Sequence, residues 1–288
     1  MTTSIKQGSV VVGVDGSPGS DAALGWATRY ATTRHKPLVI LHGAGGPASN
    51  TAYVAPVESR RLRMQARRIT DHALNTARLR APDLDIEVTE PLRDARDALI
   101  ESSARASVVV VGTRGRGTVR SLLLGSVSTA VAEHSSCPVA VFRPVDRDTR
   151  SEAHVAVGTD GGPASTATLE FAFELASIED RPLDVVHSWS VHDTFIDAAS
   201  YSERLRLMDE HERMLAESLA GYAEKYPDVL VQQHMPDGDV AQSLVDMSRD
   251  AAAVVIGSRG RTGPKLWMGS VSRIVVERAH STVVVVRP

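Results

Sequence analysis

The sequence lacks the features that mark secreted and membrane proteins. Its single cysteine, Cys137, cannot form an internal disulfide, which favours a reducing compartment. No stretch approaches the roughly 18 apolar residues that are needed to span a bilayer. Residues 1–7 are polar and lack the apolar core of a signal peptide. These absences predict a soluble, cytoplasmic protein that has no membrane partner.

An excess of one charge is missing as well. The chain has 32 basic and 35 acidic residues, which gives a net charge of −3. Binding to nucleic acid is therefore not expected, because neutralising phosphates requires a marked basic excess on one face. The ten histidines show no metal-ligand spacing, so no metal site is predicted.

Three motifs of catalysis or cofactor binding are also absent. No Gly-x-Gly-x-x-Gly follows a strand-like run, which argues against a dinucleotide cofactor. The P-loop pattern is missing, and with it the lysine and the magnesium-binding hydroxyl of P-loop hydrolysis. The Gly-x-Ser-x-Gly elbow of many hydrolases is missing too. No residue stands out as a general base, so we expect a binding protein rather than an enzyme.

What the chain does contain is an internal repeat. The segment Val10–Pro18 (VVVGVDGSP) recurs as Val155–Pro163 (VAVGTDGGP), a shift of 145 positions that also pairs Gly112 with Gly257. One residue is then lost from the second copy, and the shift becomes 144. A chain of 288 residues has room for roughly two domains of about 150 residues each. We therefore predict domains at 1–146 and 150–288, joined by a short charged linker.

Each copy is predicted to alternate strands and helices. Continuous apolar runs predict buried strands, and helical spacing of apolar residues or a capping aspartate predicts helices. The strands expected in the first copy are Val10–Val14, Leu38–His42, Ile86–Thr89, Val108–Val111 and Val139–Phe142, and the helices are Ser20–Arg34, Glu58–Leu79, Asp94–Arg105 and Ser126–Ser135. This alternation predicts two tandem doubly wound, Rossmann-like α/β domains, each with a parallel sheet of five strands.

The segment 112–128 is the most informative for function. Its glycines let the backbone approach a ligand closely. Gly125 and Ser126 precede a predicted helix, whose free N–H groups and dipole favour an anion. The hydroxyls of Ser126 and Ser128 add donors, and Arg114 lies among several arginines that add positive charge. Phosphate is the expected ligand. The alternative is a glycine-rich connection in which Ser126 is a simple N-cap.

The spacing Gly112-x2-Gly115-x9-Gly125-Ser126 resembles the nucleotide signature of the universal stress protein family, here in tandem form. The likeness covers nearly the whole chain, including the turn at Asp15. It implies the strand order 3-2-1-4-5, and ligands of doubly wound sheets sit where the winding reverses, here between strands one and four. Members of the family with this glycine pattern bind ATP. The resemblance therefore implies ATP, alone or with Mg²⁺, as the ligand.

The expected nucleotide-binding residues form one set in each half of the chain. In the first half they are Asp15, Gly112, Arg114, Gly115, Gly125, Ser126, Val127 and Ser128, and in the second half Asp160, Gly257, Arg259, Gly260, Gly269, Ser270, Val271 and Ser272. The aspartates would lie beside the adenosine, although an Asp before Gly is also a routine turn former. His42 and His187 would border the adenine, or simply mark the end of a strand.

The second half departs from the glycine pattern. Eight residues instead of nine separate Gly260 from Gly269, and Pro264 lies among them. A shorter loop is either absorbed by a tighter turn or moves the helix start away from the phosphate. We therefore expect the first site to be the more dependable of the two.

Three functions are compatible with this sequence. We expect an ATP-binding stress-response regulator whose nucleotide state changes its contacts with a regulatory protein partner. The alternatives are a slow ATPase that uses Asp15 and a scaffold with vestigial nucleotide sites. The closing strands Val139–Phe142 and Val283–Val286 would end their sheets, and an unpaired edge invites strand pairing. This predicts a pseudo-dimer within the chain and allows a homodimer.

Overall fold

The structure of the chain, a computed structural model, consists of two compact units, Met1–Pro144 and Val145–Pro288. The residues that it describes are 5–45, 56–113, 124–143, 153–187, 201–236, 238–258 and 268–287, with the backbone alone described for 56–58 and 201–204. None of the described helices combines the length and the apolar character that a membrane-spanning helix needs.

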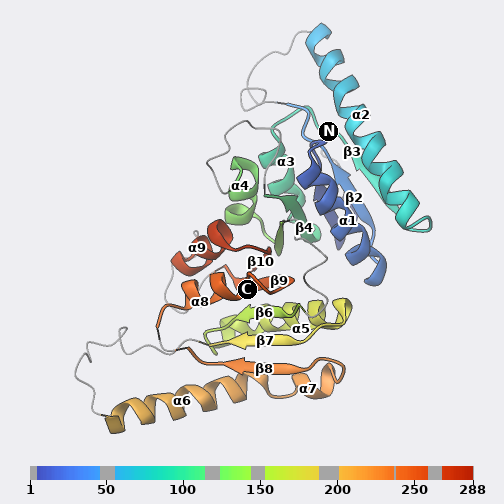
Figure 1. The fold of residues 1–288 in the computed structure, drawn as a ribbon. Coiled ribbons are helices and arrows are strands. Elements are labelled where there is room, and N and C mark those ends of the chain that lie inside the picture. Colours follow the sequence, from blue (N-terminus) through green and yellow to red (C-terminus); the bar gives the residue numbers. More distant parts are fainter. Residues whose placement is uncertain are drawn as a thin grey trace. The chain divides into compact units, whose positions relative to one another are not determined.

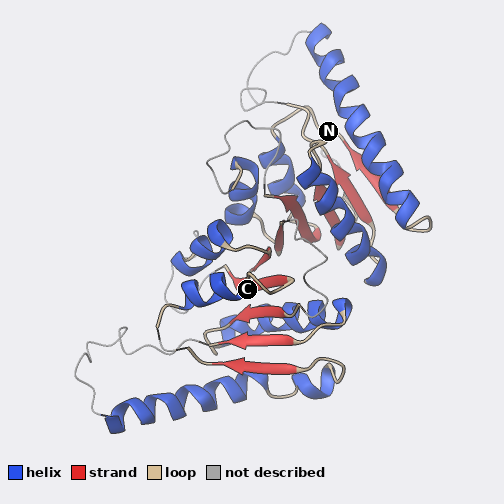
Figure 2. Cartoon of the chain, viewed as in Figure 1, coloured by secondary structure: helices blue, strands red, loops and turns tan. Residues whose placement is uncertain are grey.

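The first unit alternates strands and helices (Figures 1 and 2). Its elements are β1 (Ser9–Gly13), α1 (Pro18–Thr33), β2 (Leu38–Leu41), α2 (Pro56–Arg80), β3 (Ile86–Thr89), α3 (Ala95–Ser102), β4 (Ala106–Gly112), α4 (Ser126–His134) and β5 (Val139–Phe142). Its strands pair in the order β3-β2-β1-β4-β5, and every pair is parallel. Helix α1 packs against α2, and α3 packs against α4. The predicted doubly wound α/β unit and its strand order are confirmed.

The second unit repeats this plan. Its elements are β6 (Val155–Gly158), the short 3-10 helix η2 (Pro163–Ser165), α5 (Thr166–Glu179), β7 (Leu183–Val186), α6 (Tyr201–Leu219), α7 (Tyr222–Lys225), β8 (Val231–His234), α8 (Val240–Met247), β9 (Ala253–Gly257), α9 (Ser270–Arg278) and β10 (Thr282–Val286). The strand order is β8-β7-β6-β9-β10, again parallel. Two elements have no predicted counterpart, the η2 turn and the single turn α7.

The central strands of each sheet are buried on both faces. In β1 the side chains of Val10–Val12 are fully buried, and in β9 those of Val254 and Val255 are too. Covering a parallel sheet with helices on both faces requires such continuous apolar strands. The segments whose strands the sequence predicts from unbroken valine runs therefore lie at the centre of each core.

Side-chain caps decide where several helices begin. The Ser17 hydroxyl accepts the N–H of Ser20 at 3.2 Å, so α1 begins at Pro18, two residues before the predicted start. A proline suits this position because its missing N–H would have no partner in the first helical turn. The Asp94 carboxylate accepts the N–H of Arg96 at 2.8 Å, which confirms the predicted cap of α3.

Candidate functional site

The predicted site lies where the carboxyl ends of β1 and β4 meet. These two strands pair directly, with Val12 opposite Val110, so the turn after each strand falls at the same edge of the sheet. Gly112 ends β4 against the start of α1. A Cβ atom added to Gly112 would lie 2.9 Å from the backbone carbon and oxygen of Gly19. The absence of a side chain at Gly112 is therefore explained by the close approach of α1, whatever else the glycine contacts.

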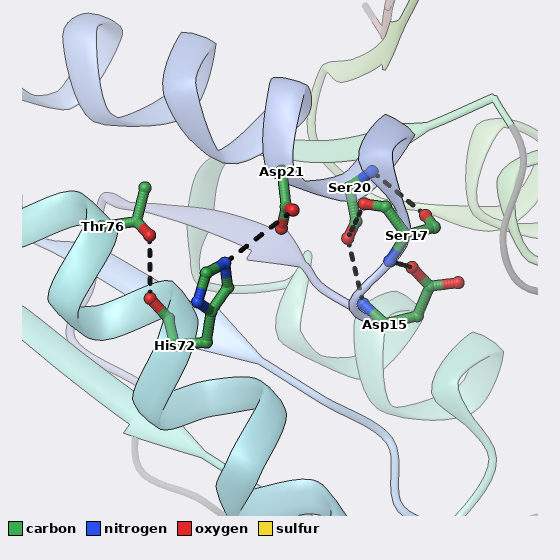
Figure 3. A network of polar contacts seen from close by, with 6 residues as sticks. All are labelled: Asp15, Ser17, Ser20, Asp21, His72 and Thr76. Atoms are coloured by element: carbon green, nitrogen blue, oxygen red, sulfur yellow. Dashed lines mark hydrogen bonds and ion pairs between the residues drawn. The ribbon is translucent and has the colours of Figure 1, made fainter.

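Asp15 organises the turn between β1 and α1 (Figure 3). Its Oδ1 accepts the N–H of Ser17 at 2.9 Å, and its own N–H is donated to the Ser20 hydroxyl at 3.3 Å. Gly16 between them has φ +76°, which a residue with a side chain rarely adopts. Asp15 thus has the turn-forming role that an Asp before Gly commonly has. Its expected contact with adenosine stays a prediction.

Helix α2 lies beside this turn. If Gly16 had a Cβ atom, it would lie 3.5 Å from Cγ1 of Ile69 on α2. Further along the same helix, Nε2 of His72 lies 3.9 Å from Oδ2 of Asp21 on α1, as Figure 3 shows. Both members of this ion pair are substantially exposed, so it is a surface contact of small energetic weight.

Helix α4 begins at this edge without a side-chain cap. Its N-cap residue is Gly125, and no side chain accepts a hydrogen bond from the first turn. Among the described residues, none accepts the backbone N–H of Ser126, Val127 or Ser128. Helices α1 and α3 of the same unit are capped by Ser17 and by Asp94. Within the part of the chain that the structure describes, the first turn of α4 thus leaves three backbone donors without an acceptor, at the positive end of a helix dipole.

The Ser128 hydroxyl is used within the protein. It donates to the carbonyl of Gly112 at 2.6 Å, while the N–H of Gly125 donates to the carbonyl of Thr113 at 2.8 Å. These two bonds fasten the first turn of α4 to the end of β4. Since the hydroxyl proton at Ser128 is committed, the donors that a phosphate could meet here are the Ser126 hydroxyl and the backbone N–H groups.

The second unit builds the same helix start. Helix α9 has Gly269 at its N-cap and no side-chain cap. The Ser272 hydroxyl donates to the carbonyl of Gly257 at 2.7 Å, and the N–H of Gly269 donates to the carbonyl of Ser258 at 2.9 Å. Ser270 is exposed at the first position of α9 and Val271 follows it. The shorter preceding loop therefore leaves this fastening to the strand intact.

The turn at Asp160 differs from the turn at Asp15. Oδ1 of Asp160 accepts the N–H of Gly162 at 3.0 Å and also the Ser165 hydroxyl at 2.5 Å. In the first unit the equivalent hydroxyl of Ser20 donates instead to the carbonyl of Ser17, at 2.9 Å. Oδ2 of Asp160 is buried and has no hydrogen-bond partner among the described residues.

The two histidines at the ends of β2 and β7 also differ. Nδ1 of His42 donates to the carbonyl of Val14 at 2.7 Å, and this ring is partly exposed. His187 is 2% exposed, and its Nδ1 bonds the carbonyl of Thr159 at 3.0 Å. Its Nε2 lies 2.7 Å from Nδ1 of His211 on α6. A carbonyl can only accept, so Nδ1 of His187 is the donor to Thr159, and in the neutral ring Nε2 is then the acceptor of the bond with His211.

Sequence reasoning missed His211, although a signal was available. At the repeat shift of 145, His211 corresponds to Ala66 on α2. A polar residue that replaces a buried alanine, at a helix position facing a strand end, is a signal worth noting. Met214 likewise corresponds to Ile69, and its Sδ lies 3.0 Å from where a Cβ on Gly161 would be.

Four predicted residues lie outside the described part of the chain. They are Arg114, Gly115, Arg259 and Gly260. Their expected contacts with ribose and phosphates stay predictions. The described residues contain no cluster of three histidine, cysteine or carboxylate side chains that could hold a metal ion.

The family model and the related sequences that match this chain all point to one family. The universal stress protein family matches residues 8–143 and again 153–287. A universal stress protein of Mycobacterium tuberculosis strain H37Rv is 35% identical over 300 residues, covering 96% of this chain and 94% of that protein. A relative from Mycolicibacterium smegmatis, also named a universal stress protein, is 33% identical over the full length of both chains.

The fold comparison agrees with this family. The crystal structure of a universal stress protein from Archaeoglobus fulgidus superposes with a TM-score of 0.69 and 19% identity, covering 98% of this chain and 97% of that one. At that identity the likeness concerns the fold alone. Together with the two matched segments and the full-length relatives, it leads to one conclusion. The chain belongs to the universal stress protein family and carries two of its domains in tandem.

Proposed function

We propose that this chain binds an adenine nucleotide, ATP, with its phosphates at the start of α4 and its adenosine beside the turn at Asp15. The observation that carries this proposal is the uncapped first turn of α4 at the switch point of the sheet. Three backbone N–H groups, at Ser126, Val127 and Ser128, have no described acceptor there. Such a helix start is a ready-made anion site.

The proposed role of the nucleotide is regulatory. The family is named for stress responses, and nucleotide binding would change which surface the protein offers to a protein partner. We expect little or no hydrolysis, because the sequence lacks a P-loop lysine and the Asp15 carboxylate is engaged in its own turn. If Mg²⁺ accompanies ATP, the phosphates are its expected ligands, since the described residues hold no metal cluster of their own.

The second unit would offer a similar phosphate site at the start of α9. The residues expected beside its adenosine are arranged differently, because the Asp160 carboxylate accepts the Ser165 hydroxyl and His187 is hydrogen-bonded to His211. We therefore expect the first unit to bind ATP more tightly than the second.

A proline at the first position of α4 tests the proposal. Ser126→Pro removes one N–H donor, yet proline is tolerated there and the extended conformation of Gly125 (φ −79°, ψ 154°) suits a following proline. We expect ATP affinity, measured by calorimetry, to fall about tenfold or more, since bonds to charged groups are worth about 1.5–3 kcal/mol. Ser126→Ala, which keeps the N–H group, is the matched control and should lose less.

The outcomes separate the alternatives. Equal ATP affinity in wild type, Ser126→Pro and the matched Ser270→Pro of the second unit would rule out the helix starts as phosphate sites. ATP at about 100 times its dissociation constant should stabilise the wild type by roughly 2.7 kcal/mol. Absence of binding would leave the vestigial scaffold, and phosphate release over many turnovers that is lost in Asp15→Ala would make the chain an ATPase.

A further inference from the structure

Helix α2 carries an unusual concentration of positive charge. Its 25 residues include seven arginines against two carboxylates, Glu58 and Asp71, a net charge of +5 in a chain whose total is −3. No lysine contributes to this charge. The overall charge balance of the sequence therefore conceals a strongly basic helix in the first unit, where α2 is long and forms one side of the unit (Figure 1).

The arginines surround an exposed methionine. Met64 is 55% exposed. Side chains three and four positions apart are neighbours on a helix surface, and around Met64 these positions are Arg60, Arg61, Arg67 and Arg68. Arg63, which precedes Met64, is exposed too. We call these five arginines and Met64 the arginine face of α2.

The arginine face has no ion-pair partner among the described residues. In the described residues, no carboxylate lies within ion-pair distance of any of its five arginines, and Asp71, one turn further along, is no exception. Like charges at these helical spacings destabilise a helix. The buried side of α2 is formed by Ala66, Ala73 and Ala77, so its apolar stripe already faces its own unit. An outside partner with negative charge would relieve the repulsion.

The corresponding helix of the second unit has the opposite charge. Helix α6 aligns with α2 at the repeat shift, and Asp209 takes the place of Met64. Its exposed carboxylates, none with an ion-pair partner among the described residues, are Asp209, Glu210, Glu212 and Glu217, against two exposed arginines, Arg206 and Arg213. Beside them Leu205 is 40% exposed. Each α6 therefore offers net negative charge and one apolar side chain.

We propose that the arginine face of α2 docks on α6 of a second copy of this chain. The charges are complementary, and each helix supplies one exposed apolar side chain, Met64 and Leu205, to the centre of the contact. Arginine and methionine are enriched in protein interfaces while lysine is depleted, as on α2. A membrane surface is disfavoured because amphipathic anchors bury an apolar face in lipid, and that of α2 is already covered.

Charge reversal and exchange test this docking in the full-length protein. The α2 variant is Arg67→Glu/Arg68→Glu, and the α6 variant is Asp209→Lys/Glu212→Lys. We expect sedimentation analysis of the wild type to show self-association at about 0.1 M salt that weakens about tenfold or more at about 1 M, where the Debye length shrinks from about 10 Å to about 3 Å. Each variant alone should be monomeric. An equimolar mixture should associate again, because the unchanged α2 of the Asp209→Lys/Glu212→Lys variant can dock on the unchanged α6 of the Arg67→Glu/Arg68→Glu variant.

The matched control is Arg78→Glu/Arg105→Glu. This control changes the net charge by the same amount, but Arg78 lies on α2 outside the arginine face and Arg105 lies outside the helix, and both are exposed. We expect it to self-associate as the wild type does. A wild type that stays monomeric at every concentration overturns the proposal, as does a mixture of the two variants that fails to associate. Self-association unchanged in both variants, with loss of binding to a duplex oligonucleotide in the α2 variant alone, would overturn it in favour of a nucleic-acid partner. Circular dichroism confirms that each variant is folded.

Discussion

The two units share one sheet order, yet they differ at the first turn after the opening strand. Ser17 caps α1 in the first unit, and its counterpart in the second unit is Gly162, which has no side chain to accept a hydrogen bond. In the second unit the helical segment after β6 therefore begins with the 3-10 turn η2, in which the N–H of Ser165 donates to the carbonyl of Gly162 at 2.9 Å. The Ser165 hydroxyl donates to the carboxylate of Asp160, which is expected to meet the nucleotide.

The histidines at the ends of β2 and β7 also have different surroundings in the two units. In the first unit Ala66 lies where the second unit has His211, so His42 has no imidazole partner and stays partly exposed. In the second unit His187 is buried and bonded on both ring nitrogens. The starts of α4 and α9 are built alike, whereas the turns at Asp15 and Asp160 and the histidines that end β2 and β7 differ between the units.

The largest expected effect concerns the packing of β4 against α1. Gly112→Val would place side-chain atoms on the backbone of Gly19, and we expect it to cost about 1–3 kcal/mol in urea unfolding. Gly257→Val is its counterpart in the second unit, where Ala164 takes the place of Gly19. Stability of Gly112→Val equal to that of the wild type would show that α1 can move away at no cost.

The next effect concerns the histidine pair. His211→Ala leaves Nε2 of the buried His187 without its donor, and we expect a loss of about 1–2 kcal/mol in the free energy of unfolding. His42→Ala in the first unit should cost less, because that ring is partly exposed and makes one described hydrogen bond. Equal losses in the two variants, measured by urea unfolding, would remove this difference between the units.

The smallest effect is the acid sensitivity of α3. The guanidinium of Arg96 donates to Asp94 and holds the pKa of that carboxyl below its usual value. A lowered pKa stabilises the fold above the pKa of the unfolded state, about 3.9, and this contribution is lost as pH falls through the folded pKa. Arg96→Ala should remove about 0.5–1 kcal/mol at pH 7 and less in acid.

The second unit supplies the matched comparison for α3. Asp239 caps α8 in the same way, but Ala241 stands where the first unit has Arg96. Ala241→Arg should therefore increase the loss of stability between about pH 7 and about pH 3, the two ends of the titration of a carboxyl group. The free energy of unfolding is measured at both pH values for the wild type, Arg96→Ala and Ala241→Arg. If the stability lost between the two pH values were the same in all three proteins, the prediction would be wrong.

Much of the fold follows from the local sequence because strands and caps are local features. The valine runs predict the buried strands, and Asp94 predicts its helix start, which the structure confirms. Boundaries were less predictable. Helix α3 ends at Ser102 rather than Arg105, because the N–H of Ser103 already bonds the carbonyls of Leu99 and Ile100 in a closing turn. The turn α7 had no predicted counterpart at all.

The sequence by itself determined the duplication, the alternation of strands and helices, and the glycine-serine pairs at which α4 and α9 begin. These depend on residue types at fixed spacing along the chain. Only the tertiary structure decided which groups are still available at those positions. Whether Ser128 donates to Gly112, whether Ser165 donates to Asp160, and whether His187 meets His211 depend on distances between elements far apart in sequence. A hydrogen bond exists only within a few tenths of an ångström of its preferred length, and packing, not local pattern, sets such distances.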